Sequence, residues 1–117
     1  MSSPTQRSLA KCRKEGQVPW IVEHFNFFSK LRHDLWGFAD LLVIDEAGGQ
    51  LIAIQTTSGG NVSKRLHKIR NNKYVRGVMA CGVRVEVHGW RKSAKTKRWE
   101  CRVVVVTPET IGEMDKE

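Results

Sequence analysis

Two polar residues at the ends of neighbouring apolar segments are the side chains best suited to hold a cation. Asp40 precedes the apolar run 41–44, and Gln55 follows the apolar run 51–54. Thr57 lies two residues beyond Gln55. Carboxylate and amide oxygens are good ligands for hard divalent cations such as Mg²⁺ or Mn²⁺. A shared cation site therefore requires the fold to bring Asp40 and Gln55 together.

The segment 45–50 between the two runs predicts how they meet. It contains two acidic residues and two glycines, which is typical of a turn. We predict an antiparallel hairpin in which Ile44 pairs with Leu51. In that register Asp40 lies directly opposite Gln55, with Cβ atoms roughly 5 Å apart. A shift of one residue would separate the two side chains.

This hairpin predicts a set of ligands and catalytic residues. Asp40 supplies the anionic ligand, Gln55 its amide oxygen and Thr56 its backbone carbonyl. Because side chains alternate along a strand, Gln55 and Thr57 share a face while Thr56 points away. Asp34 adds a second negative charge if its loop folds over the strand ends. A divalent cation held with open coordination positions promotes phosphodiester hydrolysis.

Positive charge is concentrated in the second half of the chain, where residues 61–107 hold thirteen Lys/Arg and two Asp/Glu. Residues 1–60 hold six of each, and the segment from Pro108 holds one base and four acids. Such segregation, with a net charge of +8, is typical of nucleic-acid binding. We see no feature that reads base edges, so we expect recognition of DNA shape. The expected phosphate-contacting residues are Lys30, Arg32, Lys64, Arg65, Lys68, Arg91, Lys92, Lys95, Lys97 and Arg98.

The pattern of apolar and polar residues predicts an α/β fold with a mixed central sheet flanked by helices. Ser3 and Pro4 begin a helix that Gly16 ends. The remaining expected elements are a strand over 18–28, a polar connection over 29–37, strands over 39–44 and 51–57, a basic helix from 62 to 79 broken near 71–72, and a second hairpin with strands over 83–88 and 99–105.

The length of 117 residues indicates one domain, with a core over about 4–107 and an acidic tail over 108–117. The tail is expected to be a short helix or disordered. Cys12, Cys81 and Cys101 are widely spaced, so we expect reduced, buried thiols in an intracellular, cytoplasmic protein. No apolar run has the ~20 residues of a membrane helix.

On these residues the chain resembles the PD-(D/E)XK nuclease superfamily. Phe38-Ala39-Asp40 is similar to its Asp motif, and Gln55-Thr56-Thr57 stands where an acid-x-Lys triplet would be. Within that superfamily the chain is most similar to archaeal-type Holliday junction resolvases and related small phage nucleases, on segments 13–16, 40–58 and 99–103. The resemblance implies an αβββαβ, restriction-endonuclease-like core, a Mg²⁺ or Mn²⁺ cofactor and a homodimer that cleaves branched DNA.

Two positions depart from the motif of that superfamily. Gln55 replaces a carboxylate, and Thr57 replaces the lysine that stabilises the transition state. We expect Asp34 to restore the negative charge, and Lys64, Lys68, Lys30 or Arg32 to restore the positive charge.

Two alternatives to a DNA endonuclease stay open. One is a non-catalytic nucleic-acid-binding module with a degenerate site, and the other is an RNA-processing nuclease. Glu23 fits a surface residue and an outer ligand equally well.

Overall fold

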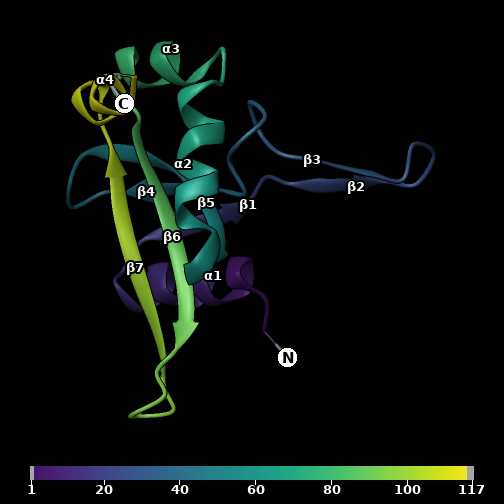
Figure 1. Cartoon of the computed structure of the whole chain (residues 1–117), viewed down its shortest axis with the longest axis vertical. Coiled ribbons are helices and arrows are strands. Elements are labelled where there is room, and N and C mark those ends of the chain that lie inside the picture. The colour runs from purple at the N-terminus through teal and green to yellow at the C-terminus, as the bar shows by residue number, and fades with distance from the viewer. Residues whose placement is uncertain (1, 116–117) are drawn as a thin grey trace.

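A five-stranded mixed sheet in the order β1-β4-β5-β6-β7 forms the centre of the computed structural model, which describes residues 2–115 (Figure 1). β5 and β6 run parallel, and the other neighbouring strands run antiparallel. The predicted mixed α/β class is therefore confirmed. The strands are β1 (Val18–Ile21), β4 (Leu41–Asp45), β5 (Gln50–Ser58), β6 (Arg84–Lys92) and β7 (Trp99–Val106).

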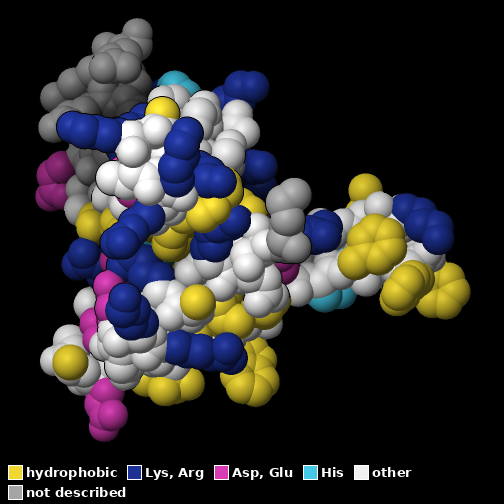
Figure 2. Space-filling model, turned by 90° about the horizontal axis from the view of Figure 1, so that it is seen from below, with side chains coloured by type: hydrophobic (Ala, Val, Ile, Leu, Met, Phe, Trp, Pro, Cys, Tyr) yellow, Lys and Arg dark blue, Asp and Glu magenta, His cyan; other side chains and the backbone are white. Residues whose placement is uncertain are grey.

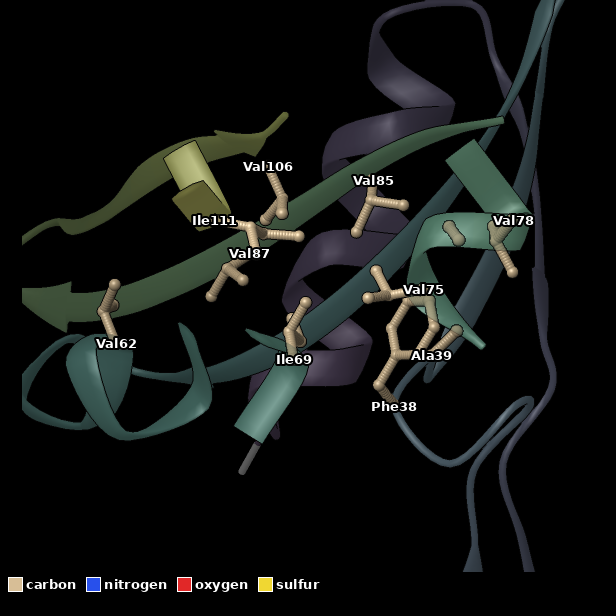
Figure 3. Close-up of a cluster of buried hydrophobic side chains, with 11 residues drawn as sticks. Phe38, Ala39, Val62, Ile69, Val75, Val78, Val85, Val87, Val106 and Ile111 are labelled. Carbon is tan, nitrogen blue, oxygen red and sulfur yellow. The ribbon is translucent and has the colours of Figure 1, made fainter. Parts of the chain in front are cut away.

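Helices cover both faces of this sheet. α1 (Pro4–Lys14) packs on one face, where Leu9 and Cys12 meet apolar side chains of β4 and β5. The other face carries a 3-10 turn (Gly59–Asn61), α2 (Val62–Arg70), α3 (Val75–Ala80) and α4 (Pro108–Asp115). Its buried cluster is centred on Phe38, Val62, Ile69, Val85 and Val87 (Figure 3). Burial of these side chains holds the sheet between two helical layers.

α1 is fixed at its N-terminus and along its buried side. The Ser3 side chain accepts a 3.2 Å hydrogen bond from the amide of Gln6, as its predicted N-cap role requires. Ser8 Oγ lies 2.8 Å from His88 Nδ1, and His88 Nε2 lies 2.9 Å from Glu86 Oε1. Ser8 and His88 are buried, so this network joins the helix to β6 rather than meeting a substrate.

The central hairpin forms in the predicted register. Ile44 pairs with Leu51, and Leu41 pairs with Ile54. Asp40 directly precedes β4, and its amide donates a 2.8 Å hydrogen bond to the carbonyl of Ile54. This register places Leu41 opposite Ile54 and Val43 opposite Ile52 in the cluster that packs on α1, and a slip of one residue would turn one strand's side chains to the other face.

The predicted strand over 18–28 is wrong beyond Ile21. The chain leaves the sheet there, and a separate two-stranded arm forms from β2 (His24–Asn26) and β3 (Leu31–His33). The arm projects away from the body of the protein (Figure 1). Part of the predicted connection over 29–37 is therefore β3.

A side-chain hydrogen bond accounts for the turn of the arm. Asn26 Oδ1 accepts hydrogen bonds from the amides of Phe28 (2.9 Å) and Ser29 (3.1 Å). This is the turn-forming contact that asparagine makes two residues ahead. Lys30 has a φ of 61° and completes the reversal. The apolar composition of the segment concealed this turn.

The remaining helices and strands lie close to the predicted ranges, although β6 extends to Lys92. The basic helix breaks between Arg70 and Val75, and the second hairpin pairs Lys92 with Trp99. α4 occupies most of the predicted acidic tail, and residues 116–117 of that tail lie outside the described residues. Cys81 is exposed after the end of α3, so the prediction that it is buried is wrong.

None of the helices within residues 2–115 has the length and apolar character that a membrane crossing requires.

Candidate functional site

Asp40 is held in one orientation by donors from β5. Its Oδ2 accepts hydrogen bonds from Gln55 Nε2 (3.0 Å), the Thr56 amide (2.7 Å) and Thr56 Oγ1 (3.1 Å). Asp40 and Gln55 are both buried. The register of the hairpin thus brings together the two residues that the sequence predicted as partners.

Thr56 takes a larger part in this contact than the sequence predicted. Its hydroxyl lies 2.8 Å from Thr5 Oγ1 of α1, so its side chain lies on the α1 face. The hydroxyl nevertheless reaches Asp40, because Asp40 lies just before the first residue of β4. The predicted ligand role of the Thr56 carbonyl stays a prediction.

Two further carboxylates converge on Asp40. Carboxylate oxygens of Glu23, Asp34 and Asp40 all lie within 4.8 Å of one another. Glu23 comes directly before the arm and Asp34 directly after it, so the arm brings both to the strand ends. The loop that carries Asp34 does fold over these ends.

Burial and neighbouring carboxylates raise the pKa values of two of these acids. Burial raises the pKa of Asp40 to about 6, with a further increase from Glu23, although the hydrogen bonds from Thr56 oppose it. Burial also raises the pKa of Asp34, together with the charge of Asp40 and against that of Lys68. In the part of the chain that the structure describes, Asp40 forms no ion pair with a lysine or arginine. The site therefore carries negative charge that its own ion pairs do not fully compensate.

The Gln55 amide leaves one of its two polar atoms unpartnered. Gln55 is 3% exposed, and its Oε1 is buried without a hydrogen-bond partner. Unpartnered buried oxygens are costly and call for an explanation such as a bound ion. Rotation of the amide would place Oε1 next to Asp40, an arrangement that a cation shared by the two oxygens would stabilise. The donors present thus fit Mg²⁺ or Mn²⁺, with Asp40, Gln55, Glu23 and Asp34 as ligands.

Basic side chains surround the carboxylates in a pocket of about 400 Å³. Arg32 and Arg65 line this pocket, which also includes Thr57. Arg32 Nη1 lies 3.4 Å from Glu23 Oε1, and Lys68 Nζ lies 3.6 Å from Asp34 Oδ2. Lys30 and Lys64 do not line the pocket. Of the four predicted replacements for the motif lysine, the structure brings Arg32 and Lys68 to the site.

The basic hairpin extends from the same end of the sheet. Thr57 pairs with Gly89 and Ser58 with Trp90, so the site lies at the end of β5 from which β6 continues toward the turn. The predicted phosphate-contacting residues of this hairpin are exposed, and they are Arg91, Lys92, Lys95, Lys97 and Arg98. β1 points to this end too, because it is antiparallel to β4 and β4 is antiparallel to β5. The base of the arm, the basic hairpin and the start of α2 therefore lie at the same end of the sheet as the carboxylates.

Sequence reasoning did not commit to two residues of the site. Glu23 was left between two interpretations, because its role depends on the chain leaving the sheet after Ile21. Thr5 was missed altogether, since only the packing of α1 brings it to Thr56. The acid at the end of a strongly apolar strand was the available signal for Glu23.

Comparisons of this chain with models of protein families, with curated proteins and with solved structures find no match. The geometry of the site therefore carries the functional argument. Clustered carboxylates, an unpartnered amide oxygen and surrounding cationic side chains together suit a phosphate ester and a divalent cation.

Proposed function

We propose that the chain is a divalent-metal-dependent DNA endonuclease that cleaves phosphodiester bonds in branched or structured DNA. One observation carries the proposal, namely that the buried Asp40 lies with Glu23, Asp34 and a Gln55 amide whose oxygen is unpartnered, in a pocket that two arginines line. The site lies at an end of the sheet that is rich in positive charge. This location favours a nucleic acid over a small phosphate ester as the substrate.

The order of elements supports the resemblance to the PD-(D/E)XK superfamily. With the arm and the short helix α3 set aside, α1, β1, β4, β5, α2 and β6 follow the αβββαβ order of a restriction-endonuclease-like core. Asp40 precedes the second of these strands, and Gln55 and Thr57 lie near the end of the third. We infer a resolvase-like nuclease that acts as a homodimer, because a four-way junction requires two cuts.

Each residue of the site has a distinct part in the proposed mechanism. Asp40, Gln55, Glu23 and Asp34 would hold Mg²⁺ or Mn²⁺, which activates water and stabilises charge on the phosphoryl oxygens when bound. Thr56 keeps the Asp40 carboxylate in place through two hydrogen bonds. Arg32, Arg65 and Lys68 provide the positive charge that Thr57 cannot provide. Thr57 lines the pocket in which the phosphate would bind.

Nicking of a four-way DNA junction tests this function. We expect wild type to nick the junction with Mg²⁺ or Mn²⁺ and to be inactive in chelator. Asp40→Asn should lower the rate at least roughly 100-fold, since it removes the central anionic ligand. Asp45→Asn is the matched control, because Asp45 lies at the other end of the hairpin and binds the Gly48 amide. Equal nicking by wild type and Asp40→Asn would contradict the proposal.

A non-catalytic nucleic-acid-binding module is the second candidate. The hydrogen bond from Gln55 to Asp40 favours it, because that contact partly satisfies the carboxylate without a cation. This candidate predicts salt-dependent binding with no hydrolysis of junction, duplex or RNA substrates at any metal concentration. The same assay with matched RNA and DNA substrates separates an RNA-processing nuclease from a DNA endonuclease.

A further inference from the structure

The tip of the β2–β3 arm exposes aromatic side chains that the rest of the protein does not cover. Phe27 is 76% exposed and Phe28 is fully exposed, and Phe25 and Leu31 are also exposed. Figure 2 shows these apolar side chains gathered at the far end of the arm, with basic side chains beside them. One fully exposed and one largely exposed phenyl ring on a small domain indicate a binding surface.

The charge of the arm selects the class of partner. Residues 24–33 include Lys30, Arg32 and two histidines, and no acid. Arm-to-arm contact with a second copy is disfavoured, because each arm carries Lys30 and Arg32 and no acid, so that like charges would meet. An anionic partner with flat apolar faces fits better. Unpaired nucleotides combine both features, since their bases stack on aromatic rings and their phosphates attract cations.

The base of the arm is part of the candidate active site. Glu23 and Asp34 directly flank the two strands, and Arg32 on β3 lies 3.4 Å from the Glu23 carboxylate. The arm is held as a unit by the β2–β3 pairing, the Asn26 turn and the contact of His24 with His33, whose ring centroids are 5.5 Å apart. A nucleotide bound at the tip would therefore position its own nucleic-acid strand at the carboxylate pocket.

We propose that the arm recognises unpaired bases in DNA, with Phe27 and Phe28 stacking on bases and Lys30 binding an adjacent phosphate. The arm gives the protein its preference for branched or open DNA over continuous duplex. The inference rests on the proposed function only for where cleavage occurs. Recognition of unpaired bases is a binding event that needs no cleavage.

The test measures binding without metal, so that cleavage has no influence on it. Fluorescence anisotropy in chelator compares the full chain with Phe27→Ala/Phe28→Ala on a single-stranded oligonucleotide, a four-way junction with unpaired bases at the branch, and a continuous duplex. We expect the variant to lose roughly tenfold or more in affinity for the first two DNAs. Affinity for duplex should change less than twofold. 2-Aminopurine at an unpaired position should report stacking by wild type only.

A matched control removes another exposed aromatic ring. Trp20 is 72% exposed on β1, outside the arm, so Trp20→Ala should leave all three affinities unchanged. Because Phe27 and Phe28 are exposed, thermal unfolding should be the same for wild type and variant.

Three results would overturn the inference. They are unchanged affinity of the arm variant for unpaired DNA, an equal loss on duplex, and absence of binding by wild type. In the first case, loss of a self-associated species in sedimentation velocity would assign the arm to contact between copies. Selective loss on unpaired DNA by a protein that nicks no substrate would support the arm and reject the nuclease.

Discussion

Gln55 Nε2 donates a 3.0 Å hydrogen bond to Asp40 Oδ2, across the end of the central hairpin. This contact places the Gln55 amide where the PD-(D/E)XK nuclease motif has a carboxylate. It leaves Gln55 Oε1 buried and unpartnered. The cation that we propose would replace this hydrogen bond and bind the unpartnered oxygen.

The raised pKa of Asp40 predicts how stability depends on pH in the absence of metal. The pKa of Asp40 is about 6 in the fold, against an ordinary value of 3.8. Between these two pH values the native state therefore binds more protons than the unfolded chain. The free energy of unfolding should then fall as pH rises from about 4 to 6, by roughly 2 to 3 kcal/mol. Denaturant unfolding in chelator across this range measures the effect.

Two variants isolate the contribution of Asp40 to that pH dependence. Asp40→Asn cannot ionise, so its stability should exceed that of wild type above pH 6 and match it near pH 4. Asp45→Asn should keep the decline of wild type. Parallel curves for wild type and Asp40→Asn would show that Asp40 ionises without cost.

Gln55→Glu should improve metal binding, because it restores the carboxylate that the motif contains. We expect Mn²⁺ affinity to rise roughly tenfold with retained or faster nicking. Without metal the variant should be less stable than wild type, since another acid joins the cluster. Isothermal titration with Mn²⁺ gives the affinity.

Gln50 offers a matched control for that substitution. Its amide donates a 3.1 Å hydrogen bond to Asp45 at the opposite end of the hairpin. Gln50→Glu therefore repeats the same chemical change beside another aspartate. Equal changes in Mn²⁺ affinity for the two variants would place the cation elsewhere.

Lys68 is predicted to support catalysis more than stability. Its ion pair with Asp34 is 3.6 Å long and partly exposed, so Lys68→Ala should change the free energy of unfolding by less than roughly 1 kcal/mol. The nicking rate at saturating metal should fall roughly tenfold or more. Lys64→Ala is the control, because Lys64, unlike Lys68, forms no ion pair with a site carboxylate in the described part of the chain. The account of Lys68 fails if both variants cleave at the wild-type rate.

The turn of the β6–β7 hairpin should contribute phosphate contacts. Replacement of Lys95, Lys97 and Arg98 by Gln should reduce the slope of log affinity against log salt by roughly 1 to 2.5. Binding of a duplex at several salt concentrations measures this slope. The control removes the same charge from exposed positions away from the site, through Arg13→Gln, Lys14→Gln and Lys73→Gln. Equal slopes for the two triple variants would mean that only total charge matters.

Local signals explain which parts of the fold were predictable. The hairpin register followed from a glycine-rich turn between two apolar runs, and the ends of α1 followed from Ser3 and Gly16. These signals act within a few residues, and burial on both faces of the sheet reinforces them. The Asp40–Gln55 pair was predictable because it depends on that register alone.

The arm and the full carboxylate cluster required information that the local pattern does not contain. The segment 18–28 has the composition of one strand, but the Asn26 side chain turns the chain back after β2. Glu23 reaches the site only because of this departure from the sheet. Thr5 reaches it only because Ser8 and His88 fix α1 on β6.

A crystal of the wild-type protein soaked in Mn²⁺ tests the central claim most directly. The account predicts an anomalous peak at bonding distance from Asp40, about 2.1 Å as for similar hard cations, with Gln55 Oε1 turned toward it and Glu23 or Asp34 beside it. A fully soaked crystal with no peak at Asp40, and with the Gln55 amide still donating to that carboxylate, would contradict it.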